Sequence, residues 1–203
     1  MRVLLLVVLI ALAQPAAAAG PTILVVGDSI SAGYGIAVEE GWVARLRARL
    51  DAQGYPHAVV NASVSGDTTS GGRARLPAAL ERHEPAVVVI ELGGNDGLRG
   101  LPLDAMRVNL AAMVTDARDA GARVLLLGVR LPPNYGPAYT ERFTEVFRTV
   151  ARRHDVALVP RVLAGVGERA GLMQADGIHP NAAGHARILE TVWPKLQPLL
   201  ERP

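Results

Sequence analysis

Residues 22–35 read TILVVGDSISAGYG, an apolar run followed by a glycine-rich polar turn. The apolar residues 22–26 predict a buried strand, and the turn places Ser29 at the carboxyl end of that strand. The flanking glycines let a ligand approach the exposed backbone N–H groups. The stretch therefore predicts the first strand of an α/β fold with a serine positioned for chemistry, although Asp28, Ser29 and Ser31 are also residues that commonly cap turns.

Four further short apolar runs follow along the chain, with amphipathic helical patterns between them. The predicted strands cover residues 22–26, 58–62, 86–92, 124–129 and 156–159. The run 86–92 is the most apolar of residues 20–203, which is typical of a central parallel strand buried on both faces. This alternation predicts a doubly wound α/β sandwich with a five-stranded parallel sheet.

Local signals mark the ends of several predicted helices. Gly54 and Gly121 stand where left-handed helix stops are expected, and Asn181 is a natural N-cap for the last helix. Pro77 weakens the helix predicted over 73–83. Pro194 and Pro198 are expected to distort the end of the last helix.

The first residues have the pattern of a secretory signal peptide: a short basic start, an apolar run over 3–13 and a small-residue tract over 14–20. The apolar run is shorter than the about 20 residues that a membrane-spanning helix needs, so an uncleaved anchor is the weaker reading. We expect residues 1–19 to be a cleaved signal peptide and residues 20–203 to be one domain. The mature protein is then periplasmic or secreted, with no stable insertion in a membrane.

Composition excludes several classes of site and partner. The chain has no cysteine, which excludes disulfides, thiolate metal sites and a cysteine nucleophile. The formal net charge is only +2 and Lys195 is the only lysine, so no polybasic stripe is present and nucleic acid is not an expected partner. We expect a monomer that needs no cofactor.

Four polar turns follow apolar runs or precede the last helix, and they carry Ser29, Gly66, Asn95, and Asp176 with His179. If the strand order is 2-1-3-4-5, the turns after the first three strands are neighbours in space. Ester or thioester cleavage needs a nucleophile, a base, a group that orients the base and fixed oxyanion donors. The candidates are Ser29, His179, Asp176, and the backbone N–H groups of Ser29 and Gly66 with the Asn95 amide.

Each of these residues has a simpler explanation when taken alone. Asn95 could be a left-handed turn residue, Gly66 a plain turn glycine, Asp176 a capping residue and His179 a loop histidine. That all four simpler explanations hold at once, for residues in this order along the chain, is much less probable than that any one of them holds. The remaining histidines are expected to be surface or structural residues: His57, His83, His154 and His185.

Five motifs carry a resemblance to a known family: GDSISAGYG (27–35), NASVSGDTTSGG (61–72), IELGGNDGLRG (90–100), RLPPNYG (130–136) and DGIHPN (176–181). They resemble the conserved blocks of the SGNH hydrolase (GDSL esterase/lipase) superfamily, and most closely its bacterial periplasmic thioesterase I / protease I / lysophospholipase group. The resemblance implies a flavodoxin-like three-layer α/β/α sandwich, Ser29 as nucleophile, Gly66 and Asn95 in the oxyanion hole, and Asp176 and His179 completing the triad. Ile30 replaces the leucine of the GDSL name, a change of similar volume.

The leading hypothesis is a secreted serine esterase and thioesterase that acts on lysophospholipids, simple esters or acyl-CoA. A carbohydrate acetylesterase with the same triad is the alternative, and a non-catalytic flavodoxin-like binding module is a third reading. The apolar loop residues Leu98, Leu101 and Tyr135 are candidate substrate contacts and favour a lipid. A metal enzyme is poorly supported, because no histidine pair at i, i+4 is present with an added carboxylate.

The loop 97–102 follows the candidate oxyanion donor directly. Its glycines can absorb a backbone change while its leucines cover an apolar ligand, so we expect a small lid beside an acyl channel. The alternative is a rigid turn whose leucines cover the edge of the sheet.

Overall fold

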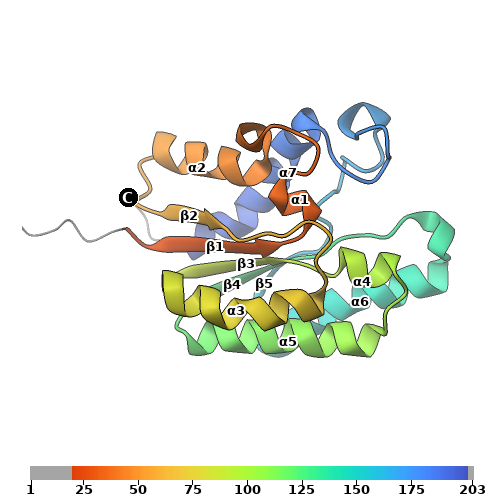
Figure 1. Cartoon of the computed structure of the whole chain (residues 1–203), viewed down its shortest axis with the longest axis horizontal. Helices are drawn as coiled ribbons and strands as arrows, with labels where there is room; N and C mark the ends of the chain where they lie inside the picture. The colour runs from red at the N-terminus through yellow and green to blue at the C-terminus, as the bar shows by residue number, and fades with distance from the viewer. Residues whose placement is uncertain (1–19, 201–203) are drawn as a thin grey trace, which may run out of the picture.

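The computed structural model describes residues 20–200 and arranges them in three layers (Figure 1). The strands are β1 (Thr22–Gly27), β2 (Ala58–Asn61), β3 (Val87–Glu91), β4 (Arg123–Leu127) and β5 (Ala157–Val159). They form one parallel sheet in the order β2-β1-β3-β4-β5. The predicted fold class and strand order are confirmed. The expected signal peptide, residues 1–19, lies outside the described residues.

Helices cover both faces of the sheet (Figure 1). One face carries α2 (Trp42–Ala52) and α7 (Ala182–Leu196), and the other carries α3 (Thr69–His83), α5 (Leu103–Asp119) and α6 (Pro137–His154). The short helices α1 (Ser29–Ala32) and α4 (Gly94–Leu98) lie at the carboxyl ends of β1 and β3. Over residues 20–200, none of these helices combines the length and apolar character needed to cross a membrane.

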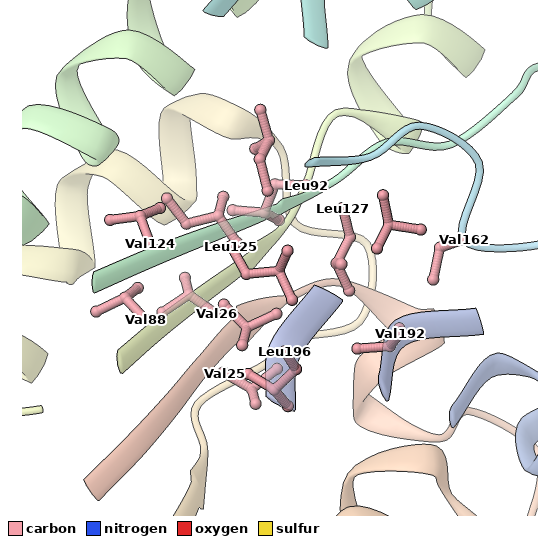
Figure 2. Packing of buried hydrophobic residues seen from close by; sticks show 14 of the residues in the cluster. Val25, Val26, Val88, Leu92, Val124, Leu125, Leu127, Val162, Val192 and Leu196 are labelled. Carbon is pink, nitrogen blue, oxygen red and sulfur yellow. The ribbon is translucent and has the colours of Figure 1, made fainter. Parts of the chain in front are cut away.

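The core lies between the sheet and the helices. All five residues of β3 are buried, as expected for a strand with β1 on one side and β4 on the other. Figure 2 shows Val192 and Leu196 of α7 among the aliphatic side chains of the sheet. The last residue of β3, Glu91, is the only one in this strand with an ionisable side chain, and it too has no exposed surface.

The predicted helix ends agree with the structure except around the prolines. Asn181 Oδ1 accepts a hydrogen bond from Gly184 N at 3.0 Å and caps α7. Gly54 and Gly121 have φ of 73° and 85°, beyond the ends of α2 and α5. In contrast, α3 is longer than predicted and passes through Pro77. Pro77 is exposed, so water can reach the carbonyl that the proline leaves without an N–H partner.

Candidate active site

Ser29, His179 and Asp176 form a continuous hydrogen-bonded chain. His179 Nε2 lies 2.9 Å from Ser29 Oγ, and His179 Nδ1 lies 2.6 Å from Asp176 Oδ2. Ser29 comes from the end of β1, whereas the other two residues lie on the loop before α7. The fold therefore brings together three predicted residues that are separated by up to 150 positions in the sequence.

A tight loop holds the Asp176 carboxylate in place. Asp176 Oδ1 accepts hydrogen bonds from the N–H groups of Ile178 at 2.9 Å and His179 at 3.0 Å. The backbone bond from His179, with the His179 side-chain bond second, lowers the pKa of Asp176 to about 2. Gly177 has φ of 68°, which lets the chain turn between the two functional side chains. Asp176 is thus ionised and directed at Nδ1 of the imidazole.

The turn after β1 presents Ser29 as the first residue of α1. Asp28 Oδ1 accepts from Ile30 N at 3.1 Å and caps this short helix. Gly33 ends it with φ of 74°. Because Ser29 is in the first turn, its own N–H has no acceptor within the helix and is free to serve a ligand.

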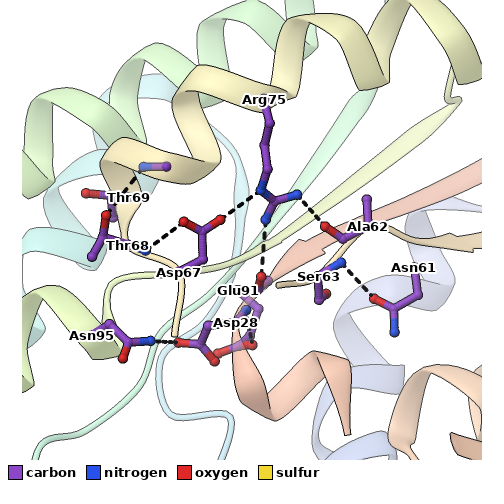
Figure 3. Close-up of polar contacts among 12 residues, drawn as sticks. Asp28, Asn61, Ala62, Ser63, Asp67, Thr68, Thr69, Arg75, Glu91 and Asn95 are labelled. Atoms are coloured by element: carbon purple, nitrogen blue, oxygen red, sulfur yellow. Dashed lines mark hydrogen bonds and ion pairs between the residues drawn. The ribbon is translucent and has the colours of Figure 1, made fainter. Parts of the chain in front are cut away.

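The candidate oxyanion donors Gly66 and Asn95 lie on neighbouring turns. Gly66 has φ of 80°, and Asn95 belongs to α4, which follows β3. Asn95 Nδ2 donates to Asp28 Oδ2 at 3.1 Å (Figure 3). Arg99 Nη2 donates to the Gly66 carbonyl at 2.8 Å and so links the two turns. The sequence reading missed Arg99, because an exposed arginine carries no local signal of such a contact.

A second arginine fixes the Gly66 turn against the sheet. Arg75 Nε donates to Asp67 Oδ2 at 2.8 Å, Nη1 donates to the carbonyl of Ala62, and Nη2 donates to the carbonyl of Gly27 at 3.2 Å (Figure 3). The guanidinium therefore joins the end of β1 to the turn that follows β2. This role was also missed, since a helical arginine usually projects into solvent.

A cavity of about 630 Å³ opens beside Ser29, Asn95 and His179. Most of its remaining wall is apolar, and the residues that supply it include Leu98, Val129, Leu131, Leu163, Met173 and Ile178. The loops after β4 and β5 thus form much of the wall. The loop after β4 was predicted to contribute through Tyr135, whereas the structure uses Val129, Leu131 and their neighbours, and the loop after β5 was not predicted at all. Apolar loop residues look like ordinary core residues in a sequence.

The three predicted substrate contacts have different positions. Leu98 lines the cavity, but Leu101 and Tyr135 are not among its lining residues. The Tyr135 hydroxyl instead donates to the carbonyl of Leu98 at 2.9 Å, which supports the end of α4 from outside. Leu101 is 38% exposed. The first two residues of the expected lid loop, Gly97 and Leu98, belong to α4.

The loop that carries His179 is held by groups that the sequence did not reveal. Gln174 Nε2 donates to the carbonyl of Tyr34 at 2.7 Å and to that of Pro180 at 2.9 Å. The Tyr34 ring packs at a tilt on the His179 imidazole, with 4.7 Å between ring centroids. These contacts tie the loop to the segment that follows the Ser29 turn.

His185 is buried, and it connects α7 to α2. Its Nδ1 accepts a hydrogen bond from the N–H of Trp42, the first residue of α2, at 3.2 Å. The N-cap residue Gly41 has no side chain to cap α2, so His185 satisfies this N–H group instead. Burial, with the charge of Arg45 second, lowers the pKa of His185 from 6.5 to about 4. The structural role expected for His185 is consistent with this contact, which requires a neutral imidazole.

This contact predicts a specific loss of stability in acid. The unfolded chain binds the His185 proton near pH 6.5 and the folded chain near pH 4, so the stabilisation is complete above 6.5 and is lost as the pH falls towards 4. The loss is about 3 kcal/mol. His185→Asn keeps an acceptor but does not titrate, so its free energy of unfolding should fall less than that of the wild type.

Urea unfolding at about pH 7 and about pH 4 measures the difference between these two proteins. His83→Asn, at the end of α3, is the matched control and should behave as the wild type. Equal losses in the wild type and His185→Asn would show that protonation of His185 does not limit stability in acid.

Over residues 20–200, no group of three or more histidine, aspartate or glutamate side chains is placed to hold a metal ion.

Comparisons with known proteins find similar sequences over most of the chain. The sequence profile of the GDSL-like Lipase/Acylhydrolase family matches residues 25–187. Esterase TesA of Pseudomonas aeruginosa is 58% identical over 203 residues, which cover 98% of this chain and 100% of that protein. Thioesterase 1/protease 1/lysophospholipase L1 of Escherichia coli (strain K12) is 42% identical over 184 residues, which cover 91% of this chain and 87% of that protein.

A solved structure gives the same result for the fold. The crystal structure of TesA superposes with a TM-score of 0.87 at 59% sequence identity, and the match covers 88% of this chain and 99% of that chain. Both the profile and the relatives span nearly all of the described fold, including every turn of the candidate site. The chain therefore belongs to the GDSL-like lipase/acylhydrolase family.

Proposed function

We propose that this chain is a serine hydrolase that cleaves carboxylic esters and thioesters of acyl chains through an acyl-enzyme on Ser29. The observation that carries the proposal is the hydrogen-bonded chain from Asp176 through His179 to Ser29 at one end of a largely apolar cavity. The names of the relatives, an esterase and a thioesterase, support the same reaction class.

In the first half of the reaction, Ser29 Oγ attacks the carbonyl carbon of the substrate, and His179 Nε2 takes the hydroxyl proton. Asp176 holds Nδ1–H and stabilises the imidazolium that results. The negative charge that develops on the carbonyl oxygen is met by the N–H groups of Ser29 and Gly66 and by the Asn95 amide. The tetrahedral intermediate then collapses, the bond to the alcohol or thiol breaks, and His179 returns the proton to the leaving group.

In the second half, water replaces the leaving group. His179 takes a proton from this water, whose oxygen attacks the acyl carbon on Ser29. The same donors meet the second oxyanion, and collapse of this intermediate releases the carboxylic acid and restores the Ser29 hydroxyl with the proton held by His179. No cofactor enters either step.

The cavity favours acyl chains as the group that is transferred. Its apolar wall suits a hydrocarbon chain, so lysophospholipids, simple esters and acyl-CoA are the proposed substrates. A carbohydrate acetylesterase would need a mostly polar wall for a sugar, whereas charged residues such as Arg130, Arg161 and Glu168 are a minority of this lining. A binding module would have no use for the Asp176–His179 pair. We also propose that residues 1–19 direct export to the periplasm or the medium, on the pattern of the sequence alone.

The test is the hydrolysis of p-nitrophenyl esters of increasing chain length, together with acyl-CoA. We expect turnover of both classes, with kcat/KM rising from acetate to medium-length chains as the cavity fills. Activity confined to acetylated sugars would favour the carbohydrate acetylesterase, and no hydrolysis of any ester by folded protein would contradict the proposal.

Two leucines of the expected lid provide a matched pair of variants. Leu98 lines the cavity and Leu101 does not. Since each buried methylene contributes about 0.8 kcal/mol, Leu98→Ala should lower kcat/KM for long-chain esters by about tenfold relative to acetate. Leu101→Ala should leave the ratio of long-chain to acetate activity unchanged. An equal loss on acetate and long chains in Leu98→Ala would instead indicate that Leu98 supports the oxyanion donors of α4.

A further inference from the structure

Glu91 is a buried acid directly beneath the candidate active site. It is the last residue of β3, has no exposed surface, and pairs in the sheet register with Gly27, the residue before Asp28. Figure 3 draws its carboxyl group beside that of Asp28. The proposed mechanism gives Glu91 no role, although a buried carboxyl group is costly unless it is neutral or fully paired.

The contacts of Glu91 are those of a neutral acid. Oε2 accepts from Ser31 Oγ at 2.8 Å and from Asp28 N at 3.4 Å. Ser31 Oγ donates this bond to Glu91 and itself accepts from Trp42 Nε1 at 3.2 Å. Oε1 is buried and receives no hydrogen bond from the described part of the chain. An ionised carboxylate would leave this oxygen without a donor, whereas a protonated oxygen is itself a donor.

The carboxyl group that lies beside that of Glu91 belongs to Asp28 (Figure 3). Its side chain forms a hydrogen bond with that of Glu91, and two carboxyl groups can share such a bond only if one is protonated. Burial raises the pKa of Asp28 to about 6, in spite of the hydrogen bonds that Asp28 accepts from Ile30 N and Asn95 Nδ2, so at neutral pH Asp28 is still mostly ionised. Burial, with the charge of Asp28 second, raises the pKa of Glu91 well above its usual value. The shared proton therefore belongs on Glu91.

The ionised Asp28 in turn fixes the side chain of Asn95. One amide hydrogen of Asn95 goes to Asp28 Oδ2 at 3.1 Å, and Oδ1 lies 3.5 Å from Arg99 Nη2. This pair of contacts leaves the second amide hydrogen free for the oxyanion. We propose that Glu91 is a positioning residue that, as a neutral carboxylic acid, donates to Asp28 and so holds the Asn95 amide as an oxyanion donor. The proposal rests on the role of Asn95 in the proposed function.

The first test compares two replacements of similar size. Glutamine supplies an acceptor and an N–H donor where the neutral acid has them, so Glu91→Gln should keep most of the wild-type kcat. Glu91→Met supplies neither and should lower kcat by about 10- to 100-fold with little change in KM, because an oxyanion donor acts in the transition state. Glu190→Gln on the surface of α7 is the control and should change neither constant.

The second test detects the protonated carboxyl group of Glu91 directly and does not depend on hydrolysis. Infrared difference spectra at neutral pH should show the carbonyl band of a protonated carboxylic acid in the wild type and not in Glu91→Gln. The same difference should appear between Ser29→Ala and the Ser29→Ala/Glu91→Gln double variant, neither of which can form an acyl-enzyme. This comparison separates failure of the inference from failure of the proposed function.

Two results would overturn the inference: absence of the band in both wild type and Ser29→Ala, or a loss of kcat in Glu91→Gln as large as that in Glu91→Met. If Glu91→Met does not fold, the infrared spectra and the kcat of Glu91→Gln still decide the question.

Discussion

Replacement of Ser29 by alanine is expected to lower kcat for every ester by about 10⁶-fold, to the limit of detection. The hydroxyl is the group that would form the acyl-enzyme. Among the described residues, Ser29 has the only side chain that forms a hydrogen bond with His179 Nε2. The fold should survive, because Ser29 Oγ makes its hydrogen bond to His179 alone and contributes nothing to the apolar core.

The matched control for this variant is Ser70→Ala, on an exposed position of α3. Both proteins should keep the circular dichroism spectrum and the unfolding midpoint of the wild type, and Ser70→Ala should keep its activity. A folded Ser29→Ala protein with substantial esterase activity would exclude Ser29 as the nucleophile.

Replacement of Asp176 by asparagine is expected to have the second largest effect. The asparagine oxygen can still accept from the N–H groups of Ile178 and His179, so its amide nitrogen then faces His179 Nδ1. An N–H donor at this position favours the tautomer that places the imidazole proton towards Ser29, where an acceptor is needed. The Asp176 side chain is 39% exposed, so water can partly replace the lost carboxylate. We therefore expect kcat to fall by about 10³-fold, less than the about 10⁴-fold decrease that follows the same replacement of a buried triad aspartate.

Steady-state kinetics on a single ester measure this effect, with little change expected in KM. Asp104→Asn, at a fully exposed site at the start of α5, is the control for a lost surface charge. A decrease smaller than about tenfold would mean that Asp176 does not orient the base, and the role of the His179 loop would have to be assigned again.

The sheet and the meeting of the polar turns could be predicted because both depend on short-range patterns. Apolar runs of strand length alternate with helical periods, and a parallel sheet places the ends of its strands at one edge. Three of the candidate site residues, Ser29, Asn95 and His179, line one cavity at that edge. The expected strand order placed Ser29 and Asn95 together, whereas His179 was assigned because a serine nucleophile needs an adjacent base and because its motif resembles that of a known family.

The short helices and the cavity wall could not be predicted in the same way. A helix such as α1, which spans Ser29–Ala32, is too short to show a helical period, and its cap is the local bond from Ile30 N to Asp28. The direction of a loop side chain depends on the elements that pack around it. Leu98 and Leu101 therefore look equivalent in the sequence, although only Leu98 lines the cavity.

Glu91 illustrates a third limit. In the sequence it is one polar residue at the end of an apolar run, and nothing local indicates that it lies beneath the Asp28 turn. That contact arises because β1 and β3 are neighbours in register, with Gly27 opposite Glu91. Charge and protonation in the core follow from tertiary structure and could be assigned only from the structure.

Covalent labelling tests the central claim most directly. Incubation with an organophosphonate, which is attacked by an activated serine, should add a single adduct to the intact protein and abolish esterase activity in parallel. Peptide mapping by mass spectrometry should place that adduct on Ser29, and the Ser29→Ala protein should take up no label. Labelling of any other residue, or full inactivation without an adduct on Ser29, would contradict the account.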